Sequence, residues 1–211
     1  MICGKHMGGV AQFRGGPGGL PVGRRAQLVN ATVELLAAAG EYAVTYRAVE
    51  SAARVPPGSA TNYFSSRDAL LLYVYAEVQR WHEQVWQQLT LRSDPSEIVD
   101  LVELLTAYVA AAVRPGGPEG VLARVHAGMA EQARYWPELR PLLAKTRTRQ
   151  TGDLHRWLRA INPETPGTAA EIVVDYLHAV ISRQLSTPAE DFSACAAMAT
   201  LLTALVQPTI P

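Results

Sequence analysis

The sequence predicts an all-α protein in which a small three-helix module precedes a larger helical body. Apolar residues recur at the spacing of helices, and strand-like alternation of useful length is lacking. Stretches rich in Pro and Gly divide the chain into segments of helical length, so we expect about nine helices and no sheet. Apolar residues make up 48% of the 211 residues and charged residues 18%, which is typical of a folded chain.

The N-terminal part is expected to contain a tail and one helix. Residues 1–21 hold a glycine-rich run and few core-forming side chains, which favours a flexible tail. Apolar spacing predicts a helix over residues 24–39. Gly40 follows it and suits the left-handed conformation in which many helices end.

Two short helices are expected next. The first covers residues 45–53, because the hydroxyl of Thr45 can cap its N-terminus. The second covers residues 56–64 and begins at Pro56-Pro57, since proline is tolerated in the first turn of a helix. The pair predicts a helical hairpin with a tight turn.

The body consists of longer helices separated by proline-containing breaks. Ser66 can cap the first of them, and Asp68 is favourably placed against the helix dipole. The expected helices are residues 67–91, 96–113, 119–134, 137–161, 168–186 and 188–206.

The last two helices are apolar over most of their circumference. Such helices need burial on more than one side. Paired with the same two helices of a second copy, they would form a four-helix dimer interface, although both could instead be buried within one chain. The candidate interface residues are Ile172, Val173, Tyr176, Val180, Ala196, Ala199 and Leu202.

The second short helix has the size and chemistry that suit the major groove of DNA. The groove admits one helix, and close approach favours small side chains that can hydrogen-bond base edges. Asn62 suits adenine, and Tyr63 suits a phosphate oxygen. The alternative is an ordinary polar hairpin at the surface. The candidate DNA-binding residues are Thr45, Arg47, Gly58, Ser59, Ala60, Thr61, Asn62, Tyr63 and Arg67.

Charge gives this interpretation weak support. The chain has a formal net charge of zero. Residues 1–68 carry seven Lys/Arg against four Asp/Glu, a balance of +3, and residues 69–211 carry twelve against fifteen, a balance of −3. The positive end therefore coincides with the candidate DNA-binding segment.

The N-terminal region resembles the DNA-binding domain of the TetR family of regulators over about residues 22–82, with the helix-turn-helix at 45–64. The resemblance rests on a combination of residues: Gly40, Thr45-x-Arg47-x-Val49, Ala53-x-Val55-x-x-Gly58-Ser59, Asn62-Tyr63-Phe64 and Ser66-Arg67-Asp68-x-Leu70. It implies an all-helical homodimer with three N-terminal helices on DNA and a C-terminal domain for ligand binding and dimerisation.

Several positions depart from the family pattern, among them Thr61-Asn62, where Tyr-rich triplets are common in the family. The family commonly has Gly where Arg54 stands in the turn, and Ser or Thr where Pro56 stands. Arg54 removes the easy left-handed residue, and Pro56 removes a side-chain cap. The operator sequence therefore cannot be carried over from the family.

The body offers aromatic and polar side chains for a largely apolar pocket with a few hydrogen-bonding groups. The alternative is that they are plain core. The candidates are Trp81, His82, Trp86, Tyr108, His126, Met129 and Trp136, and the body also offers the aromatic side chains of Tyr135 and Trp157. The five histidines and two cysteines show no metal-ligand spacing, and no catalytic or nucleotide-binding motif is present, so we expect no cofactor and no enzyme activity.

The sequence thus predicts a tail (1–21), a helix-turn-helix domain (22–68) and a regulatory and dimerisation domain (69–211). We expect a cytoplasmic, dimeric DNA-binding transcriptional regulator, a repressor released by a small, largely apolar ligand. Its partners would be a pseudo-palindromic operator in double-stranded DNA, a second copy of itself and the effector, without a membrane. The alternatives are a regulator without a ligand and an all-α enzyme or carrier.

Overall fold

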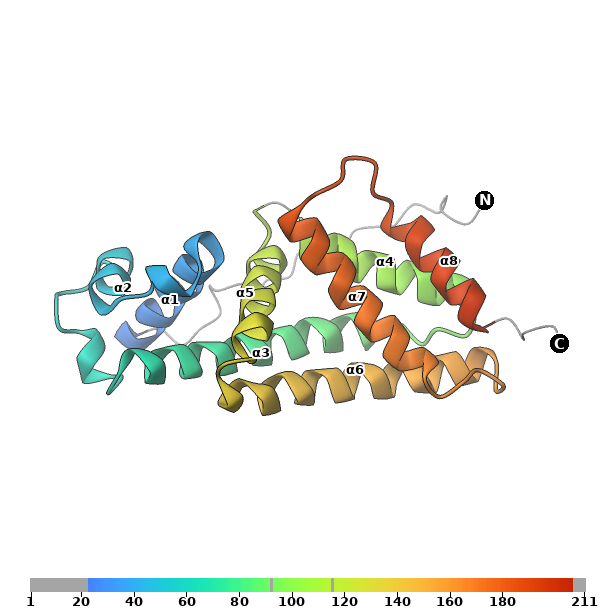
Figure 1. Ribbon diagram of the computed structural model, residues 1–211, viewed down its shortest axis with the longest axis horizontal. Helices are drawn as coiled ribbons and strands as arrows, with labels where there is room; N and C mark the ends of the chain where they lie inside the picture. The colour runs from blue at the N-terminus through green and yellow to red at the C-terminus, as the bar shows by residue number, and fades with distance from the viewer. Residues whose placement is uncertain (1–22, 92, 115, 207–211) are drawn as a thin grey trace. The chain divides into compact units, whose positions relative to one another are not determined.

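The computed structural model describes residues 23–91, 93–114 and 116–206, so the expected tail lies outside the described residues. These contain eight α-helices and three short 3₁₀-helices and no strand, which confirms the all-α fold (Figure 1). None of the described helices is long and apolar enough to cross a membrane.

The described residues form two compact units. The N-terminal unit comprises residues 23–82 and 116–143, and the C-terminal unit comprises 83–91, 93–114 and 144–206. These units are defined by packing. They do not coincide with the functional boundary expected after residue 68, which stays a prediction.

The first helices of the N-terminal unit follow their sequence signals. α1 (Arg24–Ala39) ends at Gly40, whose φ of 73° lies in the left-handed region that glycine adopts without a Cβ clash. After η2 (Glu41–Ala43), α2 (Tyr46–Ala52) is capped by Thr45, whose Oγ1 accepts the Ala48 N–H at 3.1 Å.

The helix expected over residues 56–64 is wrong. The chain forms turns there and only the single 3₁₀-turn η3 (Ala60–Asn62). Gly58 has a φ of 83°, which lies outside the α-helical region and interrupts any helix through this segment. The number of α-helices is eight rather than about nine for this reason.

The rest of the N-terminal unit is formed by α3, α5 (Pro118–Gln132) and η4 (Pro137–Leu139). α3 (Arg67–Thr90) begins where Ser66 Oγ accepts the Ala69 N–H at 3.0 Å, and it is one continuous helix that contributes residues to both units. α1 packs against α2 and α5. The core contains fully buried aliphatic side chains, including Leu28, Val33, Val44, Val49, Leu70, Leu71, Val74 and Val78.

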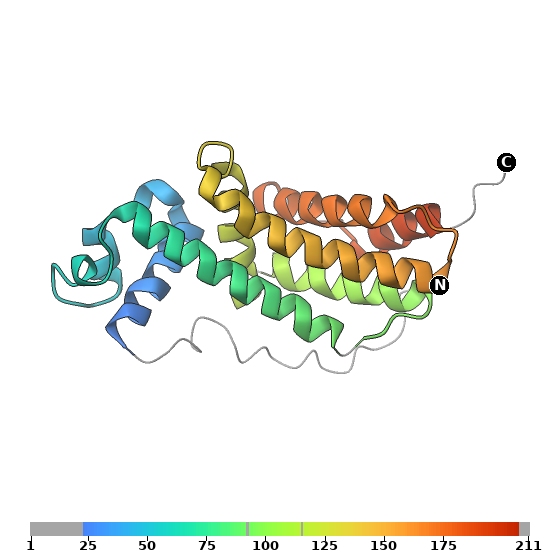
Figure 2. The same ribbon diagram turned by 90° about the horizontal axis from the view of Figure 1, so that it is seen from below.

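The C-terminal unit is built from α4 (Ile98–Val113), most of α6 (Arg140–Ile161), α7 (Ala169–Ser186) and α8 (Ala194–Val206) (Figure 2). α4 packs against α7 and α8. The core is again aliphatic, with Leu101, Leu105, Val109, Leu154, Leu158, Val173, Val174, Leu177 and Leu202 buried.

The final helix is shorter than expected. It begins at Ala194 rather than at residue 188, and Phe192 lies in the preceding non-helical segment. Polar and acidic residues, Glu190 and Asp191, stand between Pro188 and the first continuous apolar run, so this stretch has no apolar face to bury in a helix.

Candidate nucleic-acid interface

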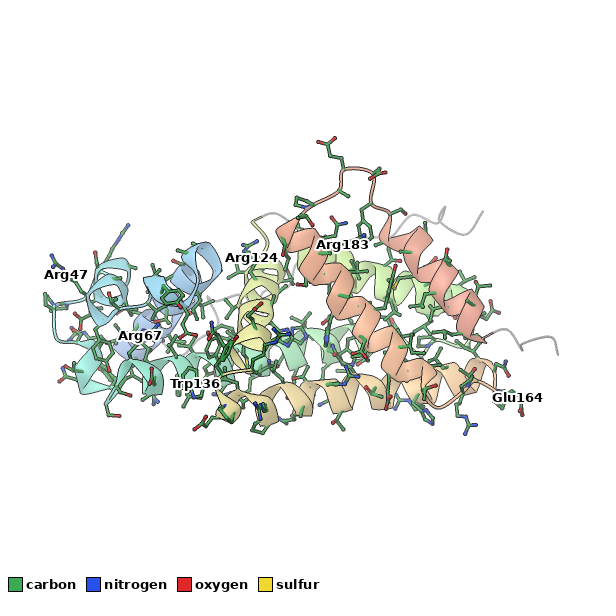
Figure 3. All side chains as sticks on the ribbon, viewed as in Figure 1. Arg47, Arg67, Arg124, Trp136, Glu164 and Arg183 are labelled. Carbon is green, nitrogen blue, oxygen red and sulfur yellow. The ribbon has the colours of Figure 1, made fainter. Side chains whose placement is uncertain are left out.

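The structure leaves six of the candidate DNA-binding residues exposed. They are Thr45, Arg47, Gly58, Thr61, Asn62 and Tyr63, and we call them the reading surface. Arg47 extends outward from α2 in Figure 3. The Thr61 hydroxyl donates to the Gly58 carbonyl at 2.8 Å, so its oxygen can still accept a hydrogen bond, and Tyr63 is 44% exposed.

Two other candidates are buried, which corrects the sequence prediction. Ser59 is 4% exposed and its hydroxyl donates to the Pro56 carbonyl at 2.6 Å. Ala60 is fully buried, and its N–H donates to Glu50 Oε1 at 2.8 Å. The turns and η3 direct this side of the segment into the core, so neither side chain is available to a base.

Arg67 is also a structural residue rather than a free cation. Its Nε donates to the Val44 carbonyl at 2.7 Å, and its Nη2 donates to the Glu41 carbonyl at 2.6 Å. The guanidinium also lies 3.5 Å from a carboxylate oxygen of Glu41 and 3.7 Å from one of Asp68. These contacts fix the chain between η2 and α2, and they satisfy the group that the sequence prediction assigned to a phosphate.

Residues 58–64, which we call the reading segment, carry four of the six residues of the reading surface and are anchored at two points. At its start the buried carboxylate of Glu50, itself 7% exposed, holds the Ala60 N–H. At its end the Tyr46 hydroxyl donates to the Phe64 carbonyl at 2.8 Å, and Phe64 is 4% exposed. Sequence reasoning missed Glu50, although a carboxylate beside Val49 on the inward face of α2 is a signal that it could have used.

The turn before this segment contains Arg54, which stands where the family commonly has Gly and was not among the candidate DNA-binding residues. Its φ of 55° makes it the one non-glycine residue with positive φ in the described part of the chain, a conformation that costs an L-residue roughly 1–2 kcal/mol. The Val55 N–H donates to the Glu50 carbonyl at 3.0 Å and the Arg54 N–H to the Ser51 carbonyl at 3.1 Å. These two bonds form the helix ending that normally places Gly at this position.

Four of the candidate pocket residues lie in the core or at its edge in the N-terminal unit. The imidazole rings of His82 and His126 are stacked with centroids 4.7 Å apart. Met129 is fully buried, and its sulfur accepts from Gln79 Nε2 at 3.4 Å. Trp136, labelled in Figure 3, meets the Tyr75 ring edge-on at 6.3 Å. A fifth, Trp81, is only partly buried in the same unit.

The other two candidates, Trp86 and Tyr108, belong to a buried cluster in the C-terminal unit. Their rings meet edge-on with centroids 5.3 Å apart, and both are at most 3% exposed. The Trp86 indole N–H donates to Asp153 Oδ2 at 2.9 Å. Gln150 Nε2 donates to the Tyr108 hydroxyl at 3.2 Å. Burial raises the pKa of Tyr108, so the phenol stays protonated at neutral pH.

Two polar atoms of this cluster have no partner within the described residues. They are the Gln150 Oε1, an acceptor, and the indole N–H of Trp157, a donor. Both side chains are 1% exposed, and Trp157 lies 6.2 Å from the Trp86 ring. Leaving a buried polar group unpaired costs about 1–3 kcal/mol each, so such atoms are unusual in a structural core. Sequence reasoning did not select Gln150, whereas Trp157 is among the aromatic side chains that it named in the body.

The candidate interface residues divide into buried and accessible groups. Val173, Val180 and Leu202 are 0%, 4% and 0% exposed, so they pack inside their own unit and cannot meet a second copy. Ile172 is 44% exposed, Ala196 is exposed, and Tyr176 and Ala199 are partly exposed. The residues that the sequence predicted for the interface thus come from two faces of each helix, because both faces are apolar.

Among the described residues, no group of three or more His, Cys, Asp or Glu could hold a metal ion.

Comparison with known proteins identifies matching families. Residues 28–74 match the family described as bacterial regulatory proteins, tetR family, and residues 93–208, more than half of the chain, match the Tetracyclin repressor-like C-terminal domain. Among curated proteins, none matches this sequence.

Solved structures share the fold at low sequence identity. A transcriptional regulator from Rhodococcus sp. Rha1 is 19% identical, with a TM-score of 0.71 over 89% of this chain and 99% of that one. Salmonella enterica GusR is 16% identical, with a TM-score of 0.64 over 88% and 96%. Bacillus subtilis FadR in complex with stearoyl-CoA is 14% identical, with a TM-score of 0.64 over 85% and 96%.

Proposed function

This chain belongs to the TetR family of bacterial regulators, with a DNA-binding and a ligand-binding domain, and from that premise we propose a dimeric repressor that a small ligand releases from its operator. The observation that carries the proposal is the exposed Thr61-Asn62-Tyr63 edge on a segment anchored by Glu50 and Tyr46. An anchored segment presents its side chains to the groove without first having to be ordered, which favours specific binding.

Within this surface we assign different tasks to different residues. Asn62 offers the bidentate donor and acceptor pair that matches adenine, a contact worth about 1–3 kcal/mol of discrimination. Tyr63 and Thr61 are placed for phosphate or base-edge contacts, and Arg47 and Thr45, at the start of α2, for the phosphate backbone. Cytoplasmic location is part of the proposal.

Dimerisation is proposed through the accessible apolar residues of α7 and α8. Ile172 on α7 leaves 44% of its surface exposed, and Tyr176 lies one turn further along the same face. Ala196 and Ala199 give α8 small side chains that allow close approach of a second copy. An Ile172→Glu variant should run as a monomer in sedimentation, whereas Ser182→Glu, on an exposed polar position of α7, should remain dimeric. A dimeric Ile172→Glu protein contradicts this face.

The effector is proposed to bind at the buried cluster of the C-terminal unit. The unpaired Gln150 oxygen and Trp157 N–H offer an acceptor and a donor on one face of α6, since positions seven apart lie two turns apart. The carboxylate of Asp153 lies in the same cluster, and it is already bound by Trp86 and by Arg156 at 3.2 Å. A neutral aromatic molecule with its own donor and acceptor fits this set better than an anion, which the carboxylate would repel.

Release requires that the effector bind one conformation more tightly than the other. Nearly complete release needs about 5.5 kcal/mol of difference between the two states. α3 carries Trp86 in the C-terminal unit and runs without interruption from Arg67 in the N-terminal unit. A shift of Trp86 on ligand binding is therefore the proposed link, because a helix transmits displacement along its axis.

The DNA part of the proposal is tested on the region upstream of the chain's own gene. Wild type should bind one fragment in preference to competitor DNA, with an affinity that falls steeply as salt rises. Asn62→Ala should lose about 5- to 150-fold in preference for that fragment and little non-specific binding. Equal binding of wild type to fragment and competitor refutes the regulator assignment.

The effector part is tested by thermal shift with paired aromatic carboxamides and carboxylates of the same skeletons. Members of the neutral set should stabilise the wild type and weaken operator binding, and Trp157→Phe or Gln150→Leu should remove both responses. If the carboxylates bind instead, the assigned chemistry is wrong. If neither set acts, the chain is a regulator without this effector class.

A further inference from the structure

Arg54 combines an unfavourable backbone with a side chain that the folded chain does not use. It is exposed and has a φ of 55°. Its side chain makes no hydrogen bond or ion pair with any residue in the described ranges. Gly would adopt this backbone without a Cβ clash, and Asn would adopt it more readily than Arg. The strain is thus not offset within the described part of the protein.

The residues that follow Arg54 leave the interface short of donors. Pro56 and Pro57 have no backbone N–H, so two of the amides that could bind a phosphate ahead of the reading segment are missing here. Arg67, the other cation near this segment in sequence, is held by the carbonyls of Val44 and Glu41. Arg47 is then the remaining exposed cation of the reading surface.

We propose that Arg54 binds the DNA backbone. Its guanidinium would replace the backbone N–H donors that Pro56 and Pro57 lack, and the strained backbone of the turn would hold the Arg54 side chain at the position of this contact. This inference rests on the DNA binding proposed above. The turn directly precedes the reading segment, and phosphates line both edges of the groove that the segment enters. A planar guanidinium can bind a phosphate with two hydrogen bonds. Strain retained at an exposed residue is explained when the residue has a partner outside the chain.

The proposal predicts opposite effects on folding and on DNA binding. Arg54→Gly should raise the Tm by about 2–8 °C, because the left-handed strain is removed. The same variant should weaken DNA binding by on the order of tenfold at moderate salt. The slope of log K against log salt should flatten by about 0.9 for each phosphate that the protein no longer neutralises, or roughly twice that for a dimer. Operator and competitor DNA should be weakened equally, unlike the effect of Asn62→Ala.

Two further variants separate charge from backbone. Arg54→Lys should keep the wild-type Tm and most of the salt slope, because it retains both the strain and the positive charge. Arg159→Gln, at an exposed arginine of α6, removes the same charge from the C-terminal unit and should leave the slope unchanged.

The measurements are Tm by calorimetry and affinity by fluorescence anisotropy over a salt series. If Arg54→Gly binds DNA with the affinity and salt slope of the wild type, the inference is overturned. The proposed function is not, because the wild type still binds DNA. An equal change of slope in Arg159→Gln also overturns it, because net charge would then be the cause. If wild type binds no DNA, the proposed function fails, and the inference with it.

Discussion

Replacing Glu50 tests how the reading segment is positioned. Glu50 Oε1 accepts the Ala60 N–H at 2.8 Å, and the two residues are 7% and 0% exposed. Glu50→Ala leaves this buried N–H without its acceptor, which costs about 1–3 kcal/mol. For a chain of this length each kcal/mol lowers the Tm by about 2–4 °C, so the Tm should fall by about 2–12 °C.

The matched variant Glu50→Gln keeps an oxygen in the same place and removes only the charge. A charge-assisted bond is roughly twice as strong as a neutral one, so Gln should retain about half of the stabilisation. The Tm from calorimetry should fall in the order wild type, Glu50→Gln, Glu50→Ala. Operator affinity, measured well below all three Tm values, should fall in the same order. If Glu50→Ala is as stable as wild type, the cost of burying the carboxylate outweighs its bond, and the positioning argument is refuted.

Two further perturbations have outcomes of known sign. Arg67→Gln should lower the Tm, because a neutral amide cannot bind the Val44 and Glu41 carbonyls as the guanidinium fork does, and it should leave the salt slope of DNA binding unchanged. A flattened slope with an unchanged Tm would return Arg67 to the phosphate role. Burial, and then Arg147, lower the pKa of His178 below its ordinary 6.5, against an opposing effect of Asp175. Below pH 6.5 the unfolded chain therefore binds more protons than the folded chain. The contribution of neutral His178 to the free energy of unfolding is present above pH 6.5 and is lost as the pH falls through the folded pKa. His178→Gln should flatten this pH dependence of stability in denaturant titrations, and an unchanged pH profile would contradict the prediction.

Local signals predicted the helices that they control. The Gly40 stop, the Thr45 cap and the Ser66 cap depend on residues within four positions of one another, and all three have the expected geometry in the structure. The helix expected over 56–64 is wrong because proline permits a helix start without requiring one, while Gly58 at a φ of 83° decides the backbone. The family membership and the all-α fold were predicted from the sequence.

The site was less predictable, because its geometry depends on contacts between distant residues. Ser59 and Ala60 look polar or small enough for a groove, yet the bond between Glu50 and Ala60, ten positions apart, turns that edge inward. The Arg67 guanidinium donates to the carbonyls of Val44 and Glu41, which are 23 and 26 positions away in the sequence. The spacing of apolar residues in the sequence does not indicate such hydrogen bonds between distant residues. It also does not distinguish the buried face of an apolar helix such as α7 from its accessible face.

The most direct test of the central claim is selection of genomic DNA fragments by the purified full chain. The wild type should recover a small set of fragments that share one two-fold-related sequence. The double variant Asn62→Ala/Tyr63→Ala should recover none of them above background while keeping the wild-type Tm, because both side chains are exposed. Wild-type protein that recovers fragments at random, or a double variant that selects the same sequence, would contradict a regulator that reads DNA through this surface.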